Sequence, residues 1–158
     1  KMITSAKHSI KITTPYLIIE PELKAALKLA SYSGVKVQLM VPGKHDYFTV
    51  GYATKSYYET LMKLGVEIYE YNDRFIHAKT LIVDDTIASV GTVNIDPRSF
   101  NFNFEATAIF ENSTVKDMAK TFADDLKIST QVIPEEWRKR GIFTRMAQAW
   151  FNLFSPMF

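Results

Sequence analysis

The sequence contains no cysteine and only three histidines, His8, His45 and His77. The absence of cysteine excludes disulfide bonds, thiolate zinc sites and a cysteine nucleophile, and it is typical of a reducing, cytosolic compartment. Three histidines are too few for a histidine-rich metal cluster, and one histidine among scattered carboxylates has no recognisable ligand spacing. We therefore expect no bound metal.

The sequence also lacks any run of about 18 apolar residues, so no segment is predicted to span a bilayer. Its 158 residues are 47% hydrophobic and 23% charged. This composition is close to the globular average and excludes long disorder, collagen and an extended coiled coil. The length suits one compact domain with a sizeable core and leaves no room for two full domains.

The net charge of +2 belongs to the C-terminal end. Residues 134–158 hold four basic and two acidic side chains, and removing these from the totals of 19 and 17 leaves 15 of each sign in residues 1–133. A balanced body counts against strong binding to nucleic-acid phosphates, so we expect no nucleic-acid partner. The charged tail is also rich in aromatic residues: Trp137, Phe143, Trp150, Phe151, Phe154 and Phe158.

The first 71 residues predict strands that alternate with helices. Strand patterns at 9–13, 35–41 and 66–71 are separated by helix patterns that begin at Pro21 and at about Thr49. The loops are short, which favours parallel crossovers and a sheet covered by helices. Residues 1–7 resemble the last turns of a helix without its start, so we expect the chain to be a piece of a longer protein.

The remaining residues predict hairpin-like strands and then helices. Strand patterns at 80–83, 87–90 and 105–111 have no long helix between them, and a helix pattern follows over 113–128. Pro134 begins a further short helix. The expected fold is α/β, with a mixed, mostly parallel β-sheet flanked by helices on both faces and with C-terminal helices. We divide it into a catalytic domain over residues 1–133 and a helical tail over residues 134–158.

Chemistry-bearing side chains gather around His77. His77 and Lys79 are two residues apart on an extended segment, so both side chains leave the same face. A turn at residues 85–86 is expected to bring Thr92 and Asn94 back beside them. Imidazole, ammonium, hydroxyl and amide groups together suit a tetrahedral anion, with His77 as a nucleophile or proton carrier near neutral pH.

Two acidic residues complete the candidate site. Glu105 opens the next strand pattern and is placed to accept the other ring N–H of His77, which fixes the tautomer. Asp84 is an odd number of residues from His77, so on a regular strand it points the other way and is expected to be a structural anchor. Each residue taken alone has an ordinary structural explanation. The hypothesis of a site therefore depends on their fixed offsets.

The offsets His77-x-Lys79-(x)4-Asp84-(x)6-Gly91-Thr92-x-Asn94 resemble the H-x-K-(x)4-D-(x)6-G-[GST]-x-N pattern of the phospholipase D superfamily. Within that superfamily the chain is similar to the C-terminal half of the bacterial cardiolipin synthases. The supporting stretches are Thr14-Pro15-Tyr16 and residues 71–77, 88–96, 98–100, 103–105 and 153–158. The resemblance covers essentially the whole chain and implies a phospholipase D-like fold.

The resemblance implies phosphatidyl transfer without a metal or other cofactor. One motif histidine attacks phosphorus and forms a phosphohistidine, while the histidine of a second motif protonates the leaving alcohol and then activates the acceptor. The implied substrate is an anionic phospholipid, phosphatidylglycerol, two molecules of which give cardiolipin and glycerol. The implied location is the bacterial cell membrane, with the catalytic domain on the cytoplasmic side and the membrane-spanning segments outside this chain.

Carried onto this sequence, the resemblance implies four catalytic residues, His77, Lys79, Asp84 and Glu105, and three phosphate-binding residues, Lys79, Thr92 and Asn94. His77 acts as nucleophile or general acid–base, Glu105 orients it, and Asp84 has a mainly supporting role.

One departure from the family pattern matters, because the cardiolipin synthases carry two such motifs in one chain. Neither His8 nor His45 is followed by the lysine of a second motif. The partner is therefore expected to be the other motif half of a parent chain, or a second copy of this chain. Two alternatives stay open at this point: a homodimeric single-motif phosphodiesterase or nuclease, and a non-catalytic half with a vestigial motif.

Two groups of aromatic residues also have two interpretations. The tail over residues 134–158 is either a segment that rests on an anionic membrane surface or a helix that packs on the domain or on the absent half. Phe100, Phe102 and Phe104 alternate beside the motif and either line a groove for a lipid chain or belong to the core. For these three residues the core is the expected place.

Overall fold

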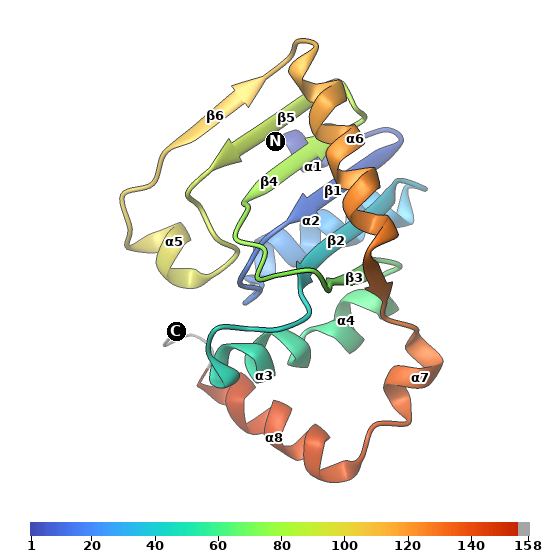
Figure 1. Ribbon diagram of the computed structural model, residues 1–158, viewed down its shortest axis with the longest axis vertical. Coiled ribbons are helices and arrows are strands. Elements are labelled where there is room, and N and C mark those ends of the chain that lie inside the picture. The colour runs from blue at the N-terminus through green and yellow to red at the C-terminus, as the bar shows by residue number, and fades with distance from the viewer. Residues whose placement is uncertain (155–158) are drawn as a thin grey trace.

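The computed structural model describes residues 1–154 and shows a seven-stranded sheet in the order β6-β5-β4-β1-β2-β3-β7 (Figure 1). The strands are β1 (Ser9–Thr13), β2 (Lys36–Pro42), β3 (Glu67–Tyr71), β4 (Thr80–Val83), β5 (Ile87–Gly91), β6 (Thr107–Phe110) and β7 (Ser129–Gln131). Six of these strands were predicted from the sequence, and β7 was not. Part of the tail prediction, residues 155–158, lies outside the described residues.

The sheet is mixed, as expected, but it is not mostly parallel. Within the described residues, β1–β2 and β2–β3 are parallel, whereas β1–β4, β4–β5, β5–β6 and β3–β7 are antiparallel. The parallel pairs are those joined by helical crossovers. After β3 the chain returns to the free edge of β1, and from there short turns can only produce antiparallel neighbours.

The helices are α1 (Met2–Ser5), α2 (Pro21–Tyr32), α3 (Phe48–Ser56), α4 (Tyr58–Lys63), α5 (Pro97–Asn101), α6 (Thr114–Lys127), α7 (Pro134–Arg138) and α8 (Ile142–Leu153). The helix predicted over 49–64 is divided at Tyr57 into α3 and α4. The short helix α5 was not predicted from the sequence. Within residues 1–154 no helix is long and apolar enough to cross a membrane.

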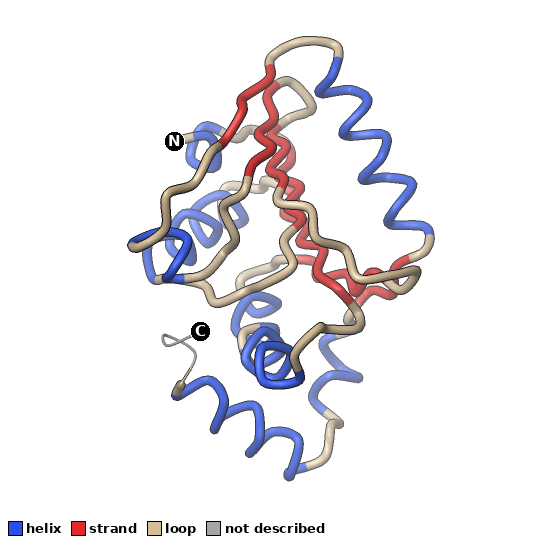
Figure 2. The backbone as a smooth tube through the Cα atoms, turned by 60° about the vertical axis from the view of Figure 1, so that its left-hand side comes forward, coloured by secondary structure: helices blue, strands red, loops and turns tan. Residues whose placement is uncertain are grey.

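Helices cover both faces of the sheet, as predicted (Figure 2). On one face, alternate residues of β2 such as Val37 and Leu39 pack against α2 and α4 in the larger core cluster, which also contains Leu27 and Leu61. On the other face, Met40, Ile82 and Ala88 pack against Val115 and Phe122 of α6 in a smaller cluster. Because successive side chains of a strand point to opposite faces, the same strands contribute residues to both core clusters.

Asp84 joins the β4–β5 turn to the start of β1. Its carboxylate accepts the backbone N–H groups of Lys7, His8 and Ser9, each at 2.8 Å. Burial raises the pKa of this carboxyl, but the three N–H donors outweigh it and hold the pKa below its ordinary value. Asp84 has a positive φ of 52°, a conformation that aspartate tolerates better than most residues. It is thus the structural anchor that its spacing predicted.

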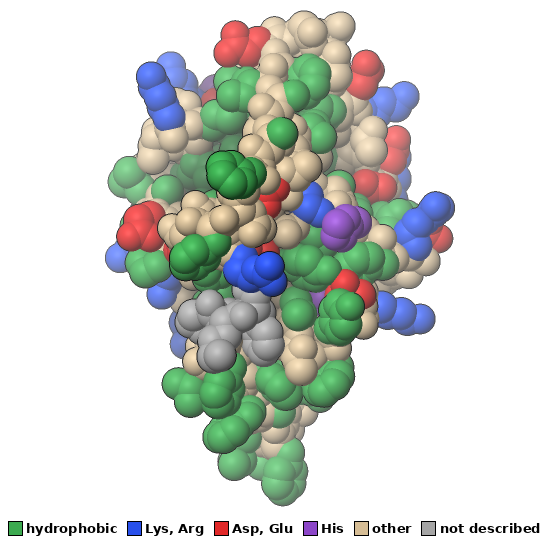
Figure 3. Space-filling view, turned by 90° about the vertical axis from the view of Figure 1, so that its left-hand side faces the viewer, with side chains coloured by type: hydrophobic (Ala, Val, Ile, Leu, Met, Phe, Trp, Pro, Cys, Tyr) green, Lys and Arg blue, Asp and Glu red, His purple; other side chains and the backbone are tan. Residues whose placement is uncertain are grey.

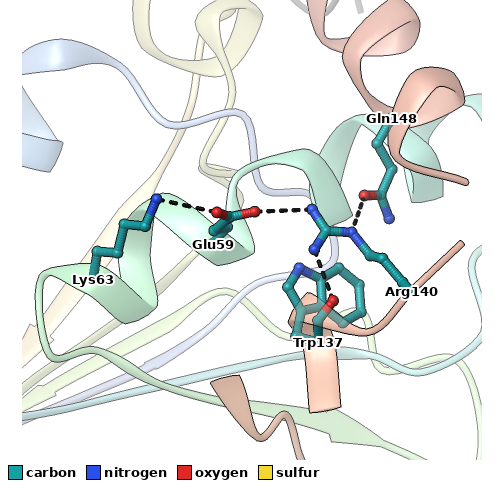
Figure 4. Close-up of polar contacts among 5 residues, drawn as sticks. All are labelled: Glu59, Lys63, Trp137, Arg140 and Gln148. Carbon is teal, nitrogen blue, oxygen red and sulfur yellow. Dashed lines mark hydrogen bonds and ion pairs between the residues drawn. The ribbon is translucent and has the colours of Figure 1, made fainter. Parts of the chain in front are cut away.

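The tail helices dock on α3 and α4 through a polar network and an aromatic contact. Arg140, before α8, binds Glu59 at 3.1 Å and Gln148 at 2.9 Å, and it donates to the backbone oxygen of Trp137 at 2.8 Å (Figure 4). The ring of Phe151 stacks on Tyr52 with a centroid distance of 5.5 Å. One face of α8 therefore packs on the domain.

The Asp84 anchor predicts a large effect from a small change. Asp84→Asn removes the charged acceptor but keeps a residue that tolerates positive φ, so we expect the free energy of unfolding to fall by about 1–3 kcal/mol. Asp85→Asn is the matched control, because Asp85 has the same φ region and makes one surface ion pair with Lys11, worth up to about 1 kcal/mol. Urea unfolding at pH 7 measures both.

The pH dependence of this contribution follows from the lowered pKa of Asp84. Its stabilisation is present above the unfolded-state pKa, near 3.8, and is lost as the pH falls through the lower folded-state pKa. The difference between the parent sequence and Asp84→Asn should therefore shrink below about pH 4. If Asp84→Asn and Asp85→Asn lower the free energy of unfolding equally at pH 7, Asp84 does not anchor the turn.

The Arg140 network predicts that α8 detaches when the guanidinium is removed. Arg140→Ala leaves Glu59 and the buried Gln148 without their shared donor, which costs about 1–3 kcal/mol. We expect faster hydrogen exchange of the α8 amides while the strands keep their protection. Arg145→Ala, at an exposed position on α8, is the control and should leave α8 exchange unchanged.

Candidate active site

The pairing of β4 with β5 assembles the motif residues. The turn after Val83 places Thr80 opposite Val90, and Gly91 N donates to Lys79 O at 3.2 Å. The next pairing sets Gly91 opposite Thr107 of β6, which brings Glu105, two residues before β6, to the same end of the sheet. The β4–β5 hairpin that the sequence predicted is present, and its register sets Gly91 beside Lys79.

His77 and Lys79 contact each other directly. The Lys79 ammonium nitrogen lies 3.1 Å from His77 Nδ1 and 3.2 Å from Nε2, and it donates to His77 O at 2.9 Å. Burial lowers the pKa of the Lys79 ammonium, while the nearby carboxylates of Glu105 and Asp96 oppose this shift. His77 itself is exposed. Its imidazole is therefore open to a substrate and lies beside a cation that suits a phosphoryl group.

Two aromatic rings hold His77 in place. Tyr16 meets the imidazole edge-on with a centroid distance of 6.1 Å, and Phe75 lies 5.6 Å away. The Tyr16 hydroxyl donates to Asp46 at 2.6 Å, and burial followed by this hydrogen bond raises the pKa of Tyr16 to about 12. Asp46 was not predicted as a site residue, because it reaches the site from a loop 30 residues away from Tyr16.

Glu105 lies in the site, but it does not accept a hydrogen bond from His77, in contrast to the prediction from the sequence. Its carboxylate accepts hydrogen bonds from Thr92 Oγ1 and from Asn103 Nδ2, the latter at 3.2 Å. These donors lower the pKa of the Glu105 carboxyl, with Thr92 contributing most. Within residues 1–154 the Glu105 carboxylate makes no hydrogen bond to the imidazole. The lysine stands next to both imidazole nitrogens instead.

Asp84 is separated from the other motif residues by the length of β4. It follows the last residue of this strand, whereas His77 and Lys79 precede the first. At about 3.3 Å per residue, roughly 15 Å or more separates Asp84 from Lys79. The structure thus gathers His77, Lys79, Thr92 and Glu105 at one end of β4 and leaves Asp84 at the far end. Asn94 lines the cavity that also contains Tyr16, the neighbour of His77.

Asn94 faces a cavity of about 490 Å³ that is lined by both polar and apolar side chains. Its Oδ1 is buried without a hydrogen-bond partner within residues 1–154, and Ser99 of α5 also lines the cavity. The other lining residues are Tyr16, Ile18, Tyr47, Thr49, Val50, Asp96, Arg98 and Asn103. Ser99 was not predicted as a site residue, since α5 itself was not expected.

Lys79 also borders a second cavity, of about 260 Å³, which is mainly apolar. Its lining includes Ile12 and Leu81 of the sheet, Leu23 of α2 and Phe100 of α5. The motif residues Lys79 and Asn94 therefore border two separate cavities.

Phe100, Phe102 and Phe104 are not in the core, so that expectation was wrong. Their exposed fractions are 42%, 79% and 108%. The reason is that α5 and the loop after it lie at the β6 edge of the sheet, where no further helix of residues 1–154 is packed over them (Figure 1).

No group of three or more histidine and carboxylate side chains is gathered closely enough to hold a metal ion in the described part of the chain. The side chains around His77 supply an imidazole, an ammonium, and hydroxyl and amide groups in addition to Glu105. This set suits binding of an anion and proton transfer.

Comparison with known proteins gives related sequences over the whole chain. The major cardiolipin synthase ClsA of Bacillus subtilis (strain 168) is 46% identical over 158 residues, covering 99% of this chain and 33% of that protein. Cardiolipin synthase 2 of Bacillus anthracis is 41% identical over 157 residues, covering 99% and 30%. The chain thus spans about a third of the length of these relatives.

Solved structures share the fold. Nuc from Salmonella typhimurium, a phospholipase D family member, matches with a TM-score of 0.70 and 21% identity, over 83% of this chain and 86% of that one. Phosphatidylserine synthase of Haemophilus influenzae Rd KW20 matches with a TM-score of 0.72 and 14% identity, over 99% and 43%. The predicted α/β phospholipase D-like fold is therefore confirmed.

A family model described as "Cardiolipin synthase, PLD-like domain" matches residues 1–126. This match covers every residue of the motif from His77 to Asn94, together with Glu105. The chain belongs to the cardiolipin synthase family of phospholipase D-like domains.

Proposed function

We propose that this chain supplies one of two motif halves of an active site that makes cardiolipin from two phosphatidylglycerol molecules. The observation that carries the proposal is the contact of Lys79 with His77 in a chain that is 41–46% identical to cardiolipin synthases. The reaction transfers a phosphatidyl group from one molecule to the other and releases glycerol.

The first step forms a bond between a histidine nitrogen and phosphorus and breaks the bond from phosphorus to the glycerol oxygen. A proton from the histidine of the second half neutralises the leaving glycerol oxygen. The acceptor hydroxyl then attacks phosphorus, loses its proton to that histidine and releases the first one. His77 takes one of these two roles.

The other motif residues hold the phosphoryl group during both steps. The Lys79 ammonium and the Asn94 amide N–H groups bind its non-bridging oxygens, and Thr92 assists. Burial lowers the pKa of Lys79, so an incoming phosphate anion restores the preference for the charged form. Glu105 acts through Thr92 and through its charge near Lys79, and Asp84 supports the fold of β4.

The exposure of the motif supports a half-site. His77 and Thr92 are exposed, and the neighbouring Phe102 and Phe104 are exposed as well. We propose that the other motif half, from a longer parent chain or from a second copy, covers this surface and adds the second histidine. The isolated chain is then inactive as a monomer.

The alternative is a homodimeric single-motif nuclease or other phosphodiesterase. The observation that favours it is the match to Nuc, which covers 86% of that short chain. Two observations favour phosphatidyl transfer instead. The identity to the cardiolipin synthases is about twice as high as to Nuc, and the 15 basic and 15 acidic residues of the body leave no charge excess to attract nucleic acid.

We also propose that α8 rests on the cytoplasmic surface of a bacterial membrane. Its outer side exposes large apolar residues, namely Ile142, Phe143, Met146, Trp150 and Leu153. Figure 3 shows hydrophobic side chains gathered at this lower end of the molecule. The nearby basic residues Arg138, Lys139 and Arg145 favour anionic lipid, at about 1 kcal/mol each.

The catalytic role of His77 is tested in a full-length cardiolipin synthase that contains this chain. His77→Ala removes the only imidazole of this half-site, so cardiolipin formation from phosphatidylglycerol should fall at least about a thousandfold. His8→Ala is the control and should keep its activity, because the His8 side chain is exposed. Normal cardiolipin formation by His77→Ala contradicts the proposal, and cleavage of DNA without lipid transfer supports the nuclease instead.

The membrane role of α8 is tested with vesicles that contain phosphatidylglycerol. The double variant Phe143→Ser, Trp150→Ser removes two large apolar side chains from the exposed face, so vesicle affinity should fall about tenfold or more. Leu29→Ser is the matched control, since Leu29 is 60% exposed on α2, away from the tail. Equal binding by all three proteins contradicts this role.

A further inference from the structure

A third cavity, of about 760 Å³, lies where the tail docks on α3, and none of the motif residues lines it. Two of its lining residues carry buried nitrogens without a hydrogen-bond partner within residues 1–154: Nδ1 and Nε2 of His45, and Nε1 of Trp137. Buried polar groups are nearly always hydrogen-bonded in native structures, so three orphaned nitrogens at one cavity point to a ligand.

Packing holds both rings in place without using their nitrogens. His45 lies against α3 at Gly51, where a Cβ would come within 2.9 Å of the imidazole Cδ2, so glycine is needed for this approach. Trp137 packs on the fully buried Tyr58 with a centroid distance of 5.0 Å. The Arg140 guanidinium lies 4.8 Å from the centroid of the indole (Figure 4). The two rings are therefore positioned, while their polar atoms stay available.

The chemistry of the orphaned nitrogens selects the kind of ligand. An indole N–H can only donate a hydrogen bond, so Trp137 requires an acceptor. Burial, followed by the charge of Lys55, lowers the pKa of the His45 imidazole. A bound anion opposes this effect and favours the imidazolium, in which both ring nitrogens are donors. An anionic acceptor therefore satisfies all three atoms.

The charges around the cavity also favour an anion. Three cationic side chains line it, Lys44, Lys55 and Arg140, against one carboxylate, that of Asp46. Lys55 and Arg140 each form an ion pair with a glutamate that is outside the lining. Lys44 is exposed and takes part in no ion pair within residues 1–154. One cation is therefore free to pair with a ligand.

The donors come from separate segments, which suits a tetrahedral anion with several oxygens. His45 and Lys44 belong to the loop before α3, whereas Trp137 belongs to α7. The border of the cavity is apolar: Phe48 lines it and is 71% exposed, and Phe143 on α8 is 83% exposed. A phosphate with acyl chains attached can place its charge among the donors and its chains against these rings.

We propose that this cavity binds a phosphate group, of an anionic phospholipid or of free phosphate, through His45, Trp137 and Lys44. The site is distinct from the motif, so this inference does not rest on the proposed function. Because its walls come from the loop before α3 and from the tail, a bound phosphate joins the tail to the domain.

The test follows the indole N–H signals of the chain by proton NMR during titration with inorganic phosphate, with sodium chloride at equal ionic strength as the reference. The chain has two tryptophans, Trp137 and Trp150, and Trp150 is 62% exposed on α8. We expect a saturable shift of the Trp137 signal and none of the Trp150 signal. Chloride producing the same shift, or both signals moving equally, overturns the site.

A second titration identifies the source of the phosphate. Short-chain phosphatidylglycerol is added below its micelle concentration, and diacylglycerol with the same chains is the phosphate-free control. A shift of the Trp137 signal with inorganic phosphate supports a site open to free phosphate, and a shift with phosphatidylglycerol alone supports a phospholipid site. No shift with either ligand, or an equal shift with diacylglycerol, overturns the proposal.

Variants separate this site from the motif. Lys44→Gln removes an exposed cation and His45→Leu removes the imidazole donors, so each should weaken the binding that shifts Trp137 about tenfold or more. Thermal unfolding checks that both variants fold. Lys24→Gln, at an exposed position on α2, and Lys79→Gln, in the motif, should both keep this affinity. Loss of the shift in Lys79→Gln assigns the phosphate to the motif and overturns the second site.

Discussion

The arrangement of the candidate site depends on the close approach of β5 to β6 at Gly91. A Cβ at this position would lie 2.4 Å from Ala106 O and 2.6 Å from Thr107 Oγ1, which no side chain tolerates. Glycine lets the two strands stay paired up to their ends, and Thr92 N then donates to Ala106 O at 3.0 Å. This contact places Thr92 against Glu105, while Gly91 N bonds Lys79 O on the other side.

This constraint explains why the motif is readable from sequence. The residue offsets encode a hairpin whose two ends meet, so the period of two and a tight turn suffice to place His77 and Lys79 beside residues 91–94. Asp84 anchors this turn. Its odd separation from His77 already indicated a structural role. The strand segments were equally predictable from the sequence, because strands of four or more apolar and β-branched residues produce a clear pattern.

The features that sequence reasoning missed depend on contacts between distant segments. The placement of β4 beside β1 is set by which sheet edge is free, and β7 is a three-residue strand that exists through its pairing with β3. The sequence predicts a hydrogen bond from His77 to Glu105, but the strand register places Glu105 beside Thr92, which donates to it instead. The exposure of Phe102 and Phe104 depends on what covers the sheet edge, which alternation of residues does not encode.

The tail shows why two opposed interpretations of one segment were both reasonable. The side of α8 that docks on α3 is held by polar groups, Gln148 and Asn152, as well as by Phe151. Much of its apolar surface remains on the outside, which is the reverse of an ordinary helix whose apolar face packs inward. Because polar bonds fix the inner side, the outer aromatic side is presented in one orientation relative to the sheet. A membrane contact through that side therefore constrains how the domain, and the motif with it, is turned toward a lipid surface.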